Sequence, residues 1–255
     1  MQQTSKLQLA LVTGTTSGIG LAVARQLLDR GWTVAGIARR AAGISHPHYH
    51  HIAADLADLS GSVHPVEGAI QRLWGDHRPW QRVGLVNNAA SADLLTSFEA
   101  IDPLALLRLY ALNIAAPVWL MGLVVRQCPR EAVLRIVNVS SGAAVGAFPG
   151  LAAYGSSKAA LRMAGMVAAA ELASEERRHS APSDVAIVSF EPGIVDTPMQ
   201  QVAREQPPEK FPSVHLFRDF AARGVLVPPE APAAEIVAFL EADRQPGFAE
   251  RRLGA

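Results

Sequence analysis

The sequence has little of what extracellular proteins and nucleic-acid-binding proteins depend on. It contains a single cysteine, Cys128, so no intrachain disulfide can form, which suits a reducing compartment. The 23 lysines and arginines balance the 23 aspartates and glutamates, which gives a formal net charge of zero. Nucleic-acid binding requires a surplus of basic residues that displaces counterions from phosphates. We therefore expect no nucleic-acid partner.

No targeting or membrane-spanning segment is evident in the sequence. The first six residues lack the charged start, apolar run and small-residue cleavage site of a signal peptide. The longest apolar stretch, residues 114–125, contains Pro117 and is shorter than the roughly 20 residues that span a bilayer. We expect a soluble, cytoplasmic protein without a membrane partner. No metal site is expected, because the histidine spacing does not match a zinc pattern, although four histidines lie close together: His46, His48, His50 and His51.

The composition and the hydrophobic pattern predict one α/β domain over residues 1–255. Hydrophobic residues make up 49% of the chain and charged residues 18%, which is enough for a sizeable core. Short β-branched runs alternate with longer Ala- and Leu-rich runs, a pattern typical of βαβ units. We predict a doubly wound Rossmann-type domain, with a parallel sheet of about seven strands and helices on both faces. Six strands can be located, at 9–12, 33–38, 51–54, 83–87, 134–139 and 185–191, with helices at 19–30, 62–75, 103–128, 154–176 and 231–242.

One segment departs from this alternation. Residues 206–229 carry five prolines and interrupt the strand–helix order. Insertions of this length inside a compact domain are usually functional, and we expect a substrate lid over residues 198–228. The alternative is a disordered surface loop.

A glycine-rich turn follows the first predicted strand and precedes the first helix. Gly14 permits a tight turn, Gly18 lets the backbone approach a pyrophosphate, and Gly20 allows close packing between helix and strand. The helix N-terminus supplies free N–H groups and the positive end of a dipole. This arrangement predicts dinucleotide binding, and a glycine-rich turn without a ligand is the alternative.

The end of the second predicted strand indicates which dinucleotide is bound. An acidic residue about 20 positions beyond the glycines binds the ribose 2′-hydroxyl of NAD. Here Ala38 is followed by Arg39 and Arg40, which can neutralise the extra phosphate of NADP(H). The alternative is a solvated arginine pair, with NAD as the cofactor.

Further motifs, together with these, resemble the short-chain dehydrogenase/reductase family over residues 8–200. They are the Asp55-Leu56 pair, the turn at 87–90, the strand and serines at 136–141, Tyr154 with Lys158, and Pro192-Gly193 with Thr197. Ala90 stands where the family usually has glycine, a mild departure unless φ is positive there. The resemblance implies the following cofactor-binding residues: Gly14, Thr16, Ser17, Gly18, Ile19, Gly20, Arg39, Arg40, Asp55, Leu56, Asn88, Tyr154, Lys158, Pro192, Gly193, Val195 and Thr197.

Two segments, 192–200 and 217–227, resemble more narrowly the branch that contains sepiapterin reductase and bacterial benzil reductase. Members of that branch reduce α-dicarbonyl compounds or related side-chain ketones with NADPH. An acidic residue near the C-terminus anchors the pterin of sepiapterin reductase. Glu250 is the candidate for this role here, but it does not align with that residue.

Four residues form the predicted catalytic group. Tyr154 and Lys158 are four positions apart in a predicted helix and share one face, so the ammonium is expected to lower the phenol's pKa from its usual value near 10. Ser141 ends a strand and can stabilise charge on a carbonyl oxygen; Ser140 competes, but the family spacing favours Ser141. Asn113 interrupts an apolar helix, and the resemblance implies that it holds a water linking Lys158 to solvent.

These observations predict an NADP(H)-dependent reductase of a small ketone, diketone or aldehyde, with Tyr154 as general acid. A dehydrogenase that oxidises a secondary alcohol and a non-catalytic dinucleotide-binding regulator are the alternatives. Helices 103–128 and 154–176 carry more Ala and Leu than one sheet-facing side needs. The resemblance implies that they pair across a two-fold axis, so we expect a homodimer or a homotetramer.

Overall fold

The fold is a seven-stranded parallel sheet with helices on both faces, as the sequence predicts. The computed structural model describes residues 7–75, 80–175 and 181–254. Neighbouring strands follow the order β3-β2-β1-β4-β5-β6-β7, and every pair is parallel. The strands are β1 (Gln8–Thr13), β2 (Thr33–Ala38), β3 (Tyr49–Ala53), β4 (Arg82–Asn87), β5 (Val133–Val139), β6 (Asp184–Glu191) and β7 (Phe248–Arg252).

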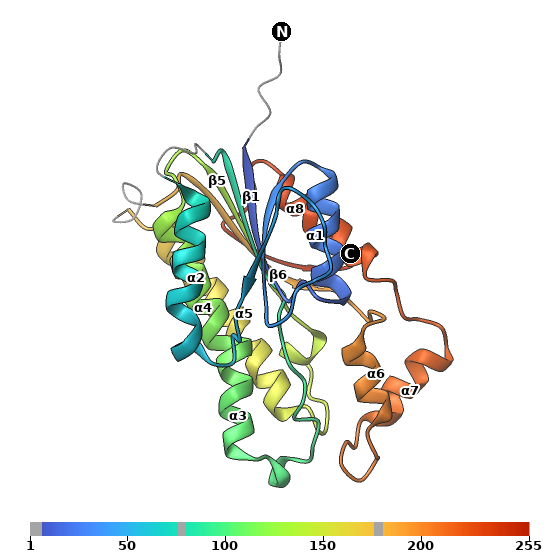
Figure 1. Ribbon diagram of the computed structural model, residues 1–255. Helices are drawn as coiled ribbons and strands as arrows, with labels where there is room; N and C mark the ends of the chain where they lie inside the picture. The colour runs from blue at the N-terminus through green and yellow to red at the C-terminus, as the bar shows by residue number, and fades with distance from the viewer. Residues whose placement is uncertain (1–6, 76–79, 176–180, 255) are drawn as a thin grey trace.

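Two helical layers bury the two faces of the sheet (Figure 1). Helices α1 (Gly18–Asp29) and α8 (Glu230–Glu241) cover one face, and α2 (Leu59–Trp74), α4 (Ala116–Gln127) and α5 (Ala152–Ala173) cover the other. Successive side chains of a strand point to opposite faces. Leu9 and Leu11 therefore join one apolar core, while Ala10 and Val12 join the second. Burial on both faces explains the continuous apolar runs of the central strands.

The strand order indicates where a ligand would bind. After β3 the chain crosses back and β4 pairs with β1, so the winding direction reverses between these two strands. Ligands of such sheets bind in the crevice beyond the carboxyl ends of the strands at this reversal. The helices α3 (Pro103–Tyr110), α6 (Pro198–Glu205) and α7 (Val214–Ala222) lie beyond that edge of the sheet (Figure 1).

Several predicted boundaries are wrong. The strand expected at 51–54 runs from Tyr49 to Ala53, and the helix expected at 62–75 begins at Leu59. The sequence located no strand at Phe248–Arg252, because three of its five residues are charged and exposed. The helix expected at 154–176 runs from 152 to 173, and residue 176 lies outside the described residues.

Two larger differences concern the site. The helix expected at 103–128 is interrupted by a π-helical segment, η2 (Ala111–Ala115), which contains Asn113. Such π-bulges occur frequently at functional sites. The proline-rich region is not a structureless loop, because α7 forms within it and α6 precedes it. Pro198 occupies the first turn of α6, where proline fits without loss of a hydrogen bond.

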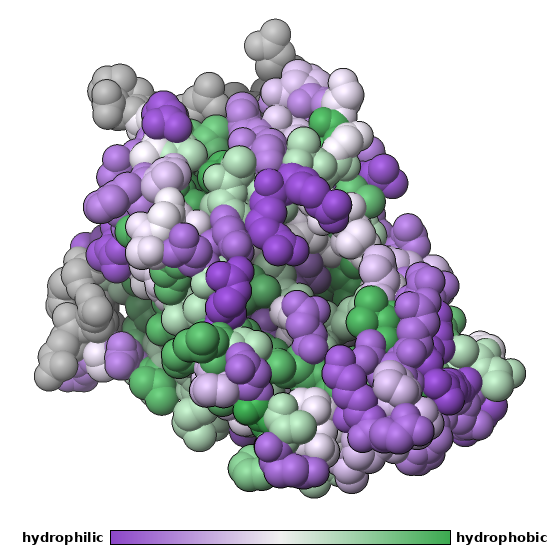
Figure 2. Space-filling model, turned by 60° about the horizontal axis from the view of Figure 1, so that its bottom comes forward, coloured by the Kyte–Doolittle hydropathy of each residue, from purple (hydrophilic) through white to green (hydrophobic). Residues whose placement is uncertain are grey.

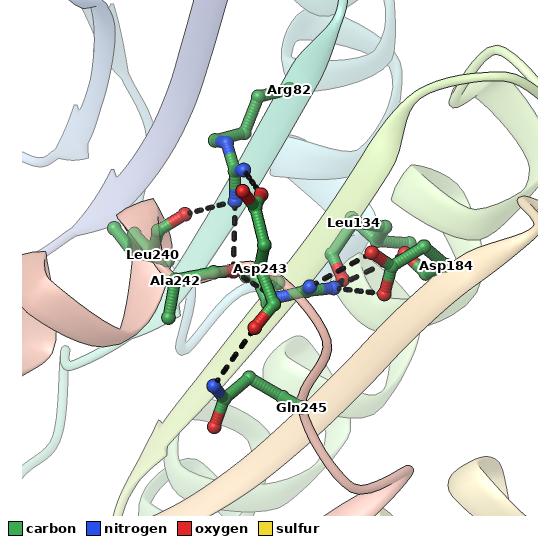
Figure 3. Close-up of polar contacts among 8 residues, drawn as sticks. Arg82, Leu134, Asp184, Leu240, Ala242, Asp243 and Gln245 are labelled. Carbon is green, nitrogen blue, oxygen red and sulfur yellow. Dashed lines mark hydrogen bonds and ion pairs between the residues drawn. The ribbon is translucent and has the colours of Figure 1, made fainter.

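The opposite edge of the sheet carries a pair of buried arginines (Figure 3). Arg82 donates from Nη1 to the carbonyl oxygens of Leu240 (2.9 Å) and Ala242 (3.0 Å), and it is ion-paired with Asp243. Arg135 is fully buried and forms a bidentate ion pair with Asp184 (2.7 and 3.0 Å). Its Nε also donates to the Ala242 carbonyl oxygen (3.1 Å). Buried charges persist only when paired. Both arginines therefore fix the C-terminal end of α8 to the sheet.

One helical stretch, Pro103–Gln127, is long and apolar enough to pass a length-and-composition test for a membrane span. Its second half packs into the core, where Leu120, Leu123 and Val124 are buried against the sheet. The π-helical segment and Pro117 also interrupt it. These contacts identify α4 as a core helix of an α/β fold.

Candidate active site

A cleft of about 630 Å³ opens at the carboxyl edge of the sheet. Its walls come from the turns after β1, β2, β3, β4 and β5, from the start of α5, and from the segment after β6. Figure 2 shows this face of the molecule, with hydrophobic residues gathered around a hollow and hydrophilic residues on the outer surface of α6 and α7. With the exceptions of Gly20 and Asn113, every predicted catalytic and cofactor-binding residue lines the cleft.

The turn after β1 has the shape required for a phosphate-binding loop. Gly14 adopts φ +73°, and its N–H donates to the carbonyl of Ile37 at 2.9 Å. Gly18 adopts φ +54° at the start of α1 and borders the cleft. Ser17 precedes the helix without capping it through its side chain, and the first turn contains no acidic residue. The free N–H groups of this turn therefore remain available to an anionic ligand.

Gly20 has a packing role. A Cβ at this position would lie 2.3 Å from the Gly14 carbonyl oxygen and 2.4 Å from Asn88 Nδ2. Gly20 is therefore closely packed, as predicted. It packs against the turn that contains Gly14 and the turn after β4, whereas the sequence predicted contact with a strand. No side chain larger than hydrogen fits without moving this backbone.

Asn88 braces the phosphate loop from the neighbouring strand. Its Nδ2 donates to the carbonyl oxygens of Thr13 (2.9 Å) and Gly14 (3.3 Å). The Thr13 hydroxyl in turn accepts from the N–H groups of Asn88 and Ala89, both at 2.9 Å. The φ of Ala90 is not positive, so alanine replaces glycine there without strain. Thr13, which the sequence reasoning did not single out, joins the two turns.

The two arginines after β2 lie at one end of the cleft. Arg39 and Arg40 are exposed, and in the parts of the chain that the structure describes neither has an ion-pair partner. Their charges are therefore available to a ligand phosphate.

Asp55 lies in the turn after β3, at the same end of the cleft. Its Oδ1 accepts from the N–H of Ala57 at 3.0 Å, and its Oδ2 lies 3.4 Å from Nη2 of Arg108. No pattern in the sequence pointed to Arg108, which belongs to α3, more than 50 residues further along the chain.

The predicted catalytic side chains converge in the middle of the cleft. Lys158 is 2% exposed, and its Nζ donates to the carbonyl of Val139 at 2.8 Å. The same Nζ lies 5.6 Å from the centre of the Tyr154 ring. The Tyr154 hydroxyl is hydrogen-bonded to the side chain of Ser141. Of the two serines, Ser141 is therefore the one that contacts Tyr154, while the N–H of Ser140 donates to Phe190.

The electrostatics of this group differ from the expectation. Burial raises the pKa of Tyr154 to about 12, and the hydrogen bond with Ser141 opposes that shift. Burial also lowers the pKa of Lys158 to about 8. The prediction that Lys158 lowers the phenol's pKa is wrong for the chain alone, because removal from water outweighs other influences on Tyr154. The phenol is accordingly protonated at neutral pH, and Lys158 is mostly charged.

Asn113 lies behind this group and does not line the cleft. It is 1% exposed, and its Oδ1 accepts from the N–H of Ser91 at 3.0 Å. Both of its amide hydrogens are used, by the Ser91 carbonyl and the Ser157 hydroxyl, each at 3.0 Å. A water held by Asn113 would therefore have to donate to its backbone carbonyl or to the second lone pair of Oδ1.

The segment after β6 closes the remaining side of the cleft. Pro192, Gly193, Val195 and Thr197 line it, and the Thr197 side chain caps α6 by accepting from the N–H of Gln200 at 3.4 Å. Lid residues follow along the same wall. They are Pro198, Met199, Gln200, Val202, Ala203 and Phe217.

Glu250 lies away from the cleft. It belongs to β7 and is ion-paired with Arg162 of α5. It is therefore not positioned as a substrate anchor, and this candidate is withdrawn. In the described parts of the chain no group of three His, Cys, Asp or Glu side chains is arranged to hold a metal ion.

A doubly wound sheet with a glycine turn at its reversal point and a long cleft beside it defines a dinucleotide-binding oxidoreductase. The chain matches the model of the short chain dehydrogenase family over residues 8–208 and belongs to that family. The family binds a nicotinamide dinucleotide.

Individual relatives support the narrower branch. The chain is 30% identical over 242 residues to a benzil reductase of Bacillus subtilis, covering 94% of this chain and 96% of that protein. It is 30% identical over 254 residues to sepiapterin reductase of Xenopus tropicalis, covering 92% of each. A solved short-chain dehydrogenase/reductase of Saccharomyces cerevisiae is similar over 97% of this chain and 96% of its own, with 26% identity and a TM-score of 0.79.

Proposed function

We propose that this protein is an NADP(H)-dependent carbonyl reductase in which Tyr154 is the general acid. One observation carries the proposal: Tyr154 lines the cleft with its hydroxyl hydrogen-bonded to Ser141. A carbonyl oxygen that gains a hydride needs a proton donor at this place. Lys158, one helical turn away, supplies the adjacent positive charge.

The residues that line the cleft fit a nicotinamide dinucleotide. The loop at Gly14–Gly18 and the start of α1 offer N–H groups to the phosphates, and Asp55 lies at the adenine end. Arg39 and Arg40, unpaired and exposed, favour the 2′-phosphate of NADP(H). The family resemblance adds that Lys158 binds the nicotinamide ribose. When bound, the cofactor supplies the hydride.

The protein's own residues orient the substrate and move the proton. Ser141 and Tyr154 donate hydrogen bonds to the carbonyl oxygen and stabilise the negative charge that develops on it. Tyr154 then transfers its proton to that oxygen. Lys158, which the Val139 carbonyl holds at 2.8 Å, would reprotonate the phenol together with the cofactor's ribose hydroxyl and a water on Asn113.

The relatives indicate the substrate class. Benzil reductase and sepiapterin reductase both match nearly the whole chain. We infer a small ketone, diketone or aldehyde. The Glu250–Arg162 ion pair argues against a pterin, because it removes the candidate acidic anchor.

The two alternative functions have less support. Oxidation of a secondary alcohol is disfavoured by Arg39 and Arg40, because they favour NADP(H), whose pool usually supports reduction. A non-catalytic regulator has no need for Ser141, Tyr154 and Lys158 to be assembled in one cleft. The free, buried Cys128 suits a reducing compartment, and we place the protein in the cytoplasm.

We also infer a homodimer or homotetramer. Met163 and Val167 on α5 and Val118 on α4 are exposed apolar residues on the outer side of these two helices. Two copies that pair through α4 and α5 would bury them.

The test is an absorbance assay of the purified chain with NADPH or NADH and a panel of ketones, diketones and aldehydes. NADPH consumption with a carbonyl compound supports the proposal. Turnover seen only as NADP-dependent oxidation of alcohols, or tight NADPH binding without turnover, would replace it with the second or third function.

A further inference from the structure

The part of the cleft beyond Tyr154 has mostly apolar walls, with the polar Gln200 as an exception on the lid side. Among its described lining residues, Asp93 is charged and exposed, and none is a lysine or arginine apart from Lys158 at the catalytic group. The cationic side chains Arg39, Arg40 and Arg108 lie at the adenine end instead. This end of the cleft is lined by Ala92, Leu94, Leu95, Leu151, Met199, Val202, Ala203 and Phe217.

Phe217 is the aromatic residue that the lid contributes to this wall. It packs against a third apolar cluster, separate from the two cores of the sheet, which also contacts Tyr154 and Met199. Its ring lies 5.3 Å from that of Phe211, tilted by 58°, and 6.1 Å from that of Phe220, edge to face. These separations are typical of favourable aromatic pairs. The Phe217 ring is therefore held between two neighbours while it borders the cleft.

Phe211 anchors this arrangement to the catalytic loop. It is fully buried, and a Cβ on Gly150 would lie 2.7 Å from its ring. Gly150 adopts φ +85°, and the nearby Ser213 hydroxyl donates to the Pro149 carbonyl at 2.7 Å. Gly150 and Pro149 lie four and five residues before Tyr154, so these contacts fasten the lid to the loop that precedes helix α5. The distance between the Phe217 ring and the reacting hydroxyl is consequently fixed by packing.

We propose that Phe217 is the specificity-determining residue of this site and selects neutral carbonyl compounds that carry an aromatic ring beside the carbonyl. A flat ring in the substrate would stack or meet edge to face with Phe217, while its carbonyl reaches Ser141 and Tyr154. Carboxylate-bearing substrates are disfavoured because the described residues that line this end include no free cation to compensate their desolvation. The proposal rests on the carbonyl reductase function and adds the substrate class.

The experiment compares 1-phenyl-1,2-propanedione with 2,3-butanedione as substrates of the wild type, Phe217→Ala and Phe220→Ala. Phe220 is on the same helix and contacts Phe217 but does not line the cleft, so it is the matched control. We expect Phe217→Ala to lower the ratio of kcat/KM for the aryl over the alkyl diketone by about tenfold. Phe220→Ala should change that ratio much less. The melting temperature and the Kd for NADPH show whether each variant is folded.

Equal losses with both diketones in Phe217→Ala, or an equal change of the ratio in Phe220→Ala, would overturn the assignment. Efficient reduction of phenylglyoxylate by the wild type would overturn the preference for neutral substrates. Calorimetric Kd values of the two diketones for the NADP-loaded chain distinguish failure of the proposed reductase function from failure of the role proposed for Phe217. If the chain binds the aryl diketone more tightly, loses this preference in Phe217→Ala and reduces neither compound, only the proposed function is refuted. If it reduces both diketones without an aryl preference, only the role of Phe217 is refuted.

Discussion

Asn113 and Ser157 are joined by a hydrogen bond of 3.0 Å between Nδ2 and Oγ, which connects the π-helical segment to the catalytic helix. Ser157 passes the connection on, since its hydroxyl donates to the carbonyl of Tyr154 at 2.7 Å. Asn113 also fixes the backbone of Ser91 beside the cleft. Asn113 in the π-helical segment is therefore connected both to the helix that carries Tyr154 and to the loop that contains Ser91.

Replacing Ser157 by alanine should weaken both stability and turnover. The change leaves one hydrogen of the Asn113 amide without a partner, which costs about 1–3 kcal/mol in a buried site. The melting temperature should fall by a few degrees per kcal/mol, and kcat should fall more than the Kd for NADPH rises. Ser156→Ala, at the exposed neighbouring position, is the control. Equal effects of the two substitutions would contradict the connection described here.

Tyr154→Phe should abolish reduction while NADPH still binds. Loss of a general acid lowers turnover by about a hundredfold to ten-thousandfold. Fluorescence titration with NADPH measures binding, and absorbance at the cofactor band measures turnover. Tyr110→Phe is a suitable control, because the Tyr110 hydroxyl bonds to Ser156 outside the cleft. Near-normal turnover by Tyr154→Phe would refute the assignment of the acid.

Arg39→Ala and Arg40→Ala should shift cofactor preference from NADPH toward NADH. A hydrogen bond to a charged group contributes about 1.5–3 kcal/mol, so each loss should raise the Kd for NADPH about tenfold or more. The Kd for NADH should stay nearly constant, because NADH lacks the 2′-phosphate. Arg25→Ala on the exposed side of α1 is the control for a general loss of positive charge. A parallel rise for both cofactors would count against 2′-phosphate recognition.

The pH dependence of stability should reveal the buried Lys158. Burial lowers its pKa to about 8 in the folded chain, from the usual lysine value of 10.5. Between these values the unfolded chain binds more protons at this residue than the folded chain, so rising pH favours the folded state. The free energy of unfolding of the wild type should therefore increase relative to that of Lys158→Met as pH rises from 8 toward 10. Denaturant titrations at several pH values measure the difference, and a constant or falling difference would contradict it.

The exposed face of α4 and α5 should mediate self-association. Met163 is 53% exposed and Val167 48% exposed on α5, so burying both in a second copy would be favourable. Light scattering at micromolar concentration should give a dimer or tetramer. The double substitution Met163→Glu and Val167→Glu should give a monomer, while Val225→Glu, in the segment after α7, should not. A monomeric wild type would refute this interface.

The sequence predicted the features that depend on local pattern. The buried strands β1, β4, β5 and β6 are continuous apolar runs, and the glycines of the phosphate loop are fixed by backbone geometry that few residues adopt. Tyr154 and Lys158 were placed together by helical spacing alone. These features need no knowledge of distant contacts.

The features that the sequence missed depend on contacts between distant segments. Strand β7 is charged along its exposed edge and is recognisable only by its pairing with β6. Arg108 reaches Asp55 across more than 50 residues. The pKa of Tyr154 followed burial, which residue spacing does not reveal. Phe211 and Phe217 lie in the proline-rich stretch that the sequence predicted as a lid, but the sequence did not indicate which of its side chains pack together.

The third apolar cluster, which joins the lid to the loop before Tyr154, shares no buried residue with the two cores beside the sheet. Its interior can accordingly be altered without a direct loss of the contacts that bury the nucleotide-binding strands. Substitutions among the lid residues of this cluster, Ala203, Phe211 and Val214, can thus change which substrates are accepted. The inherited redox machinery would remain in place.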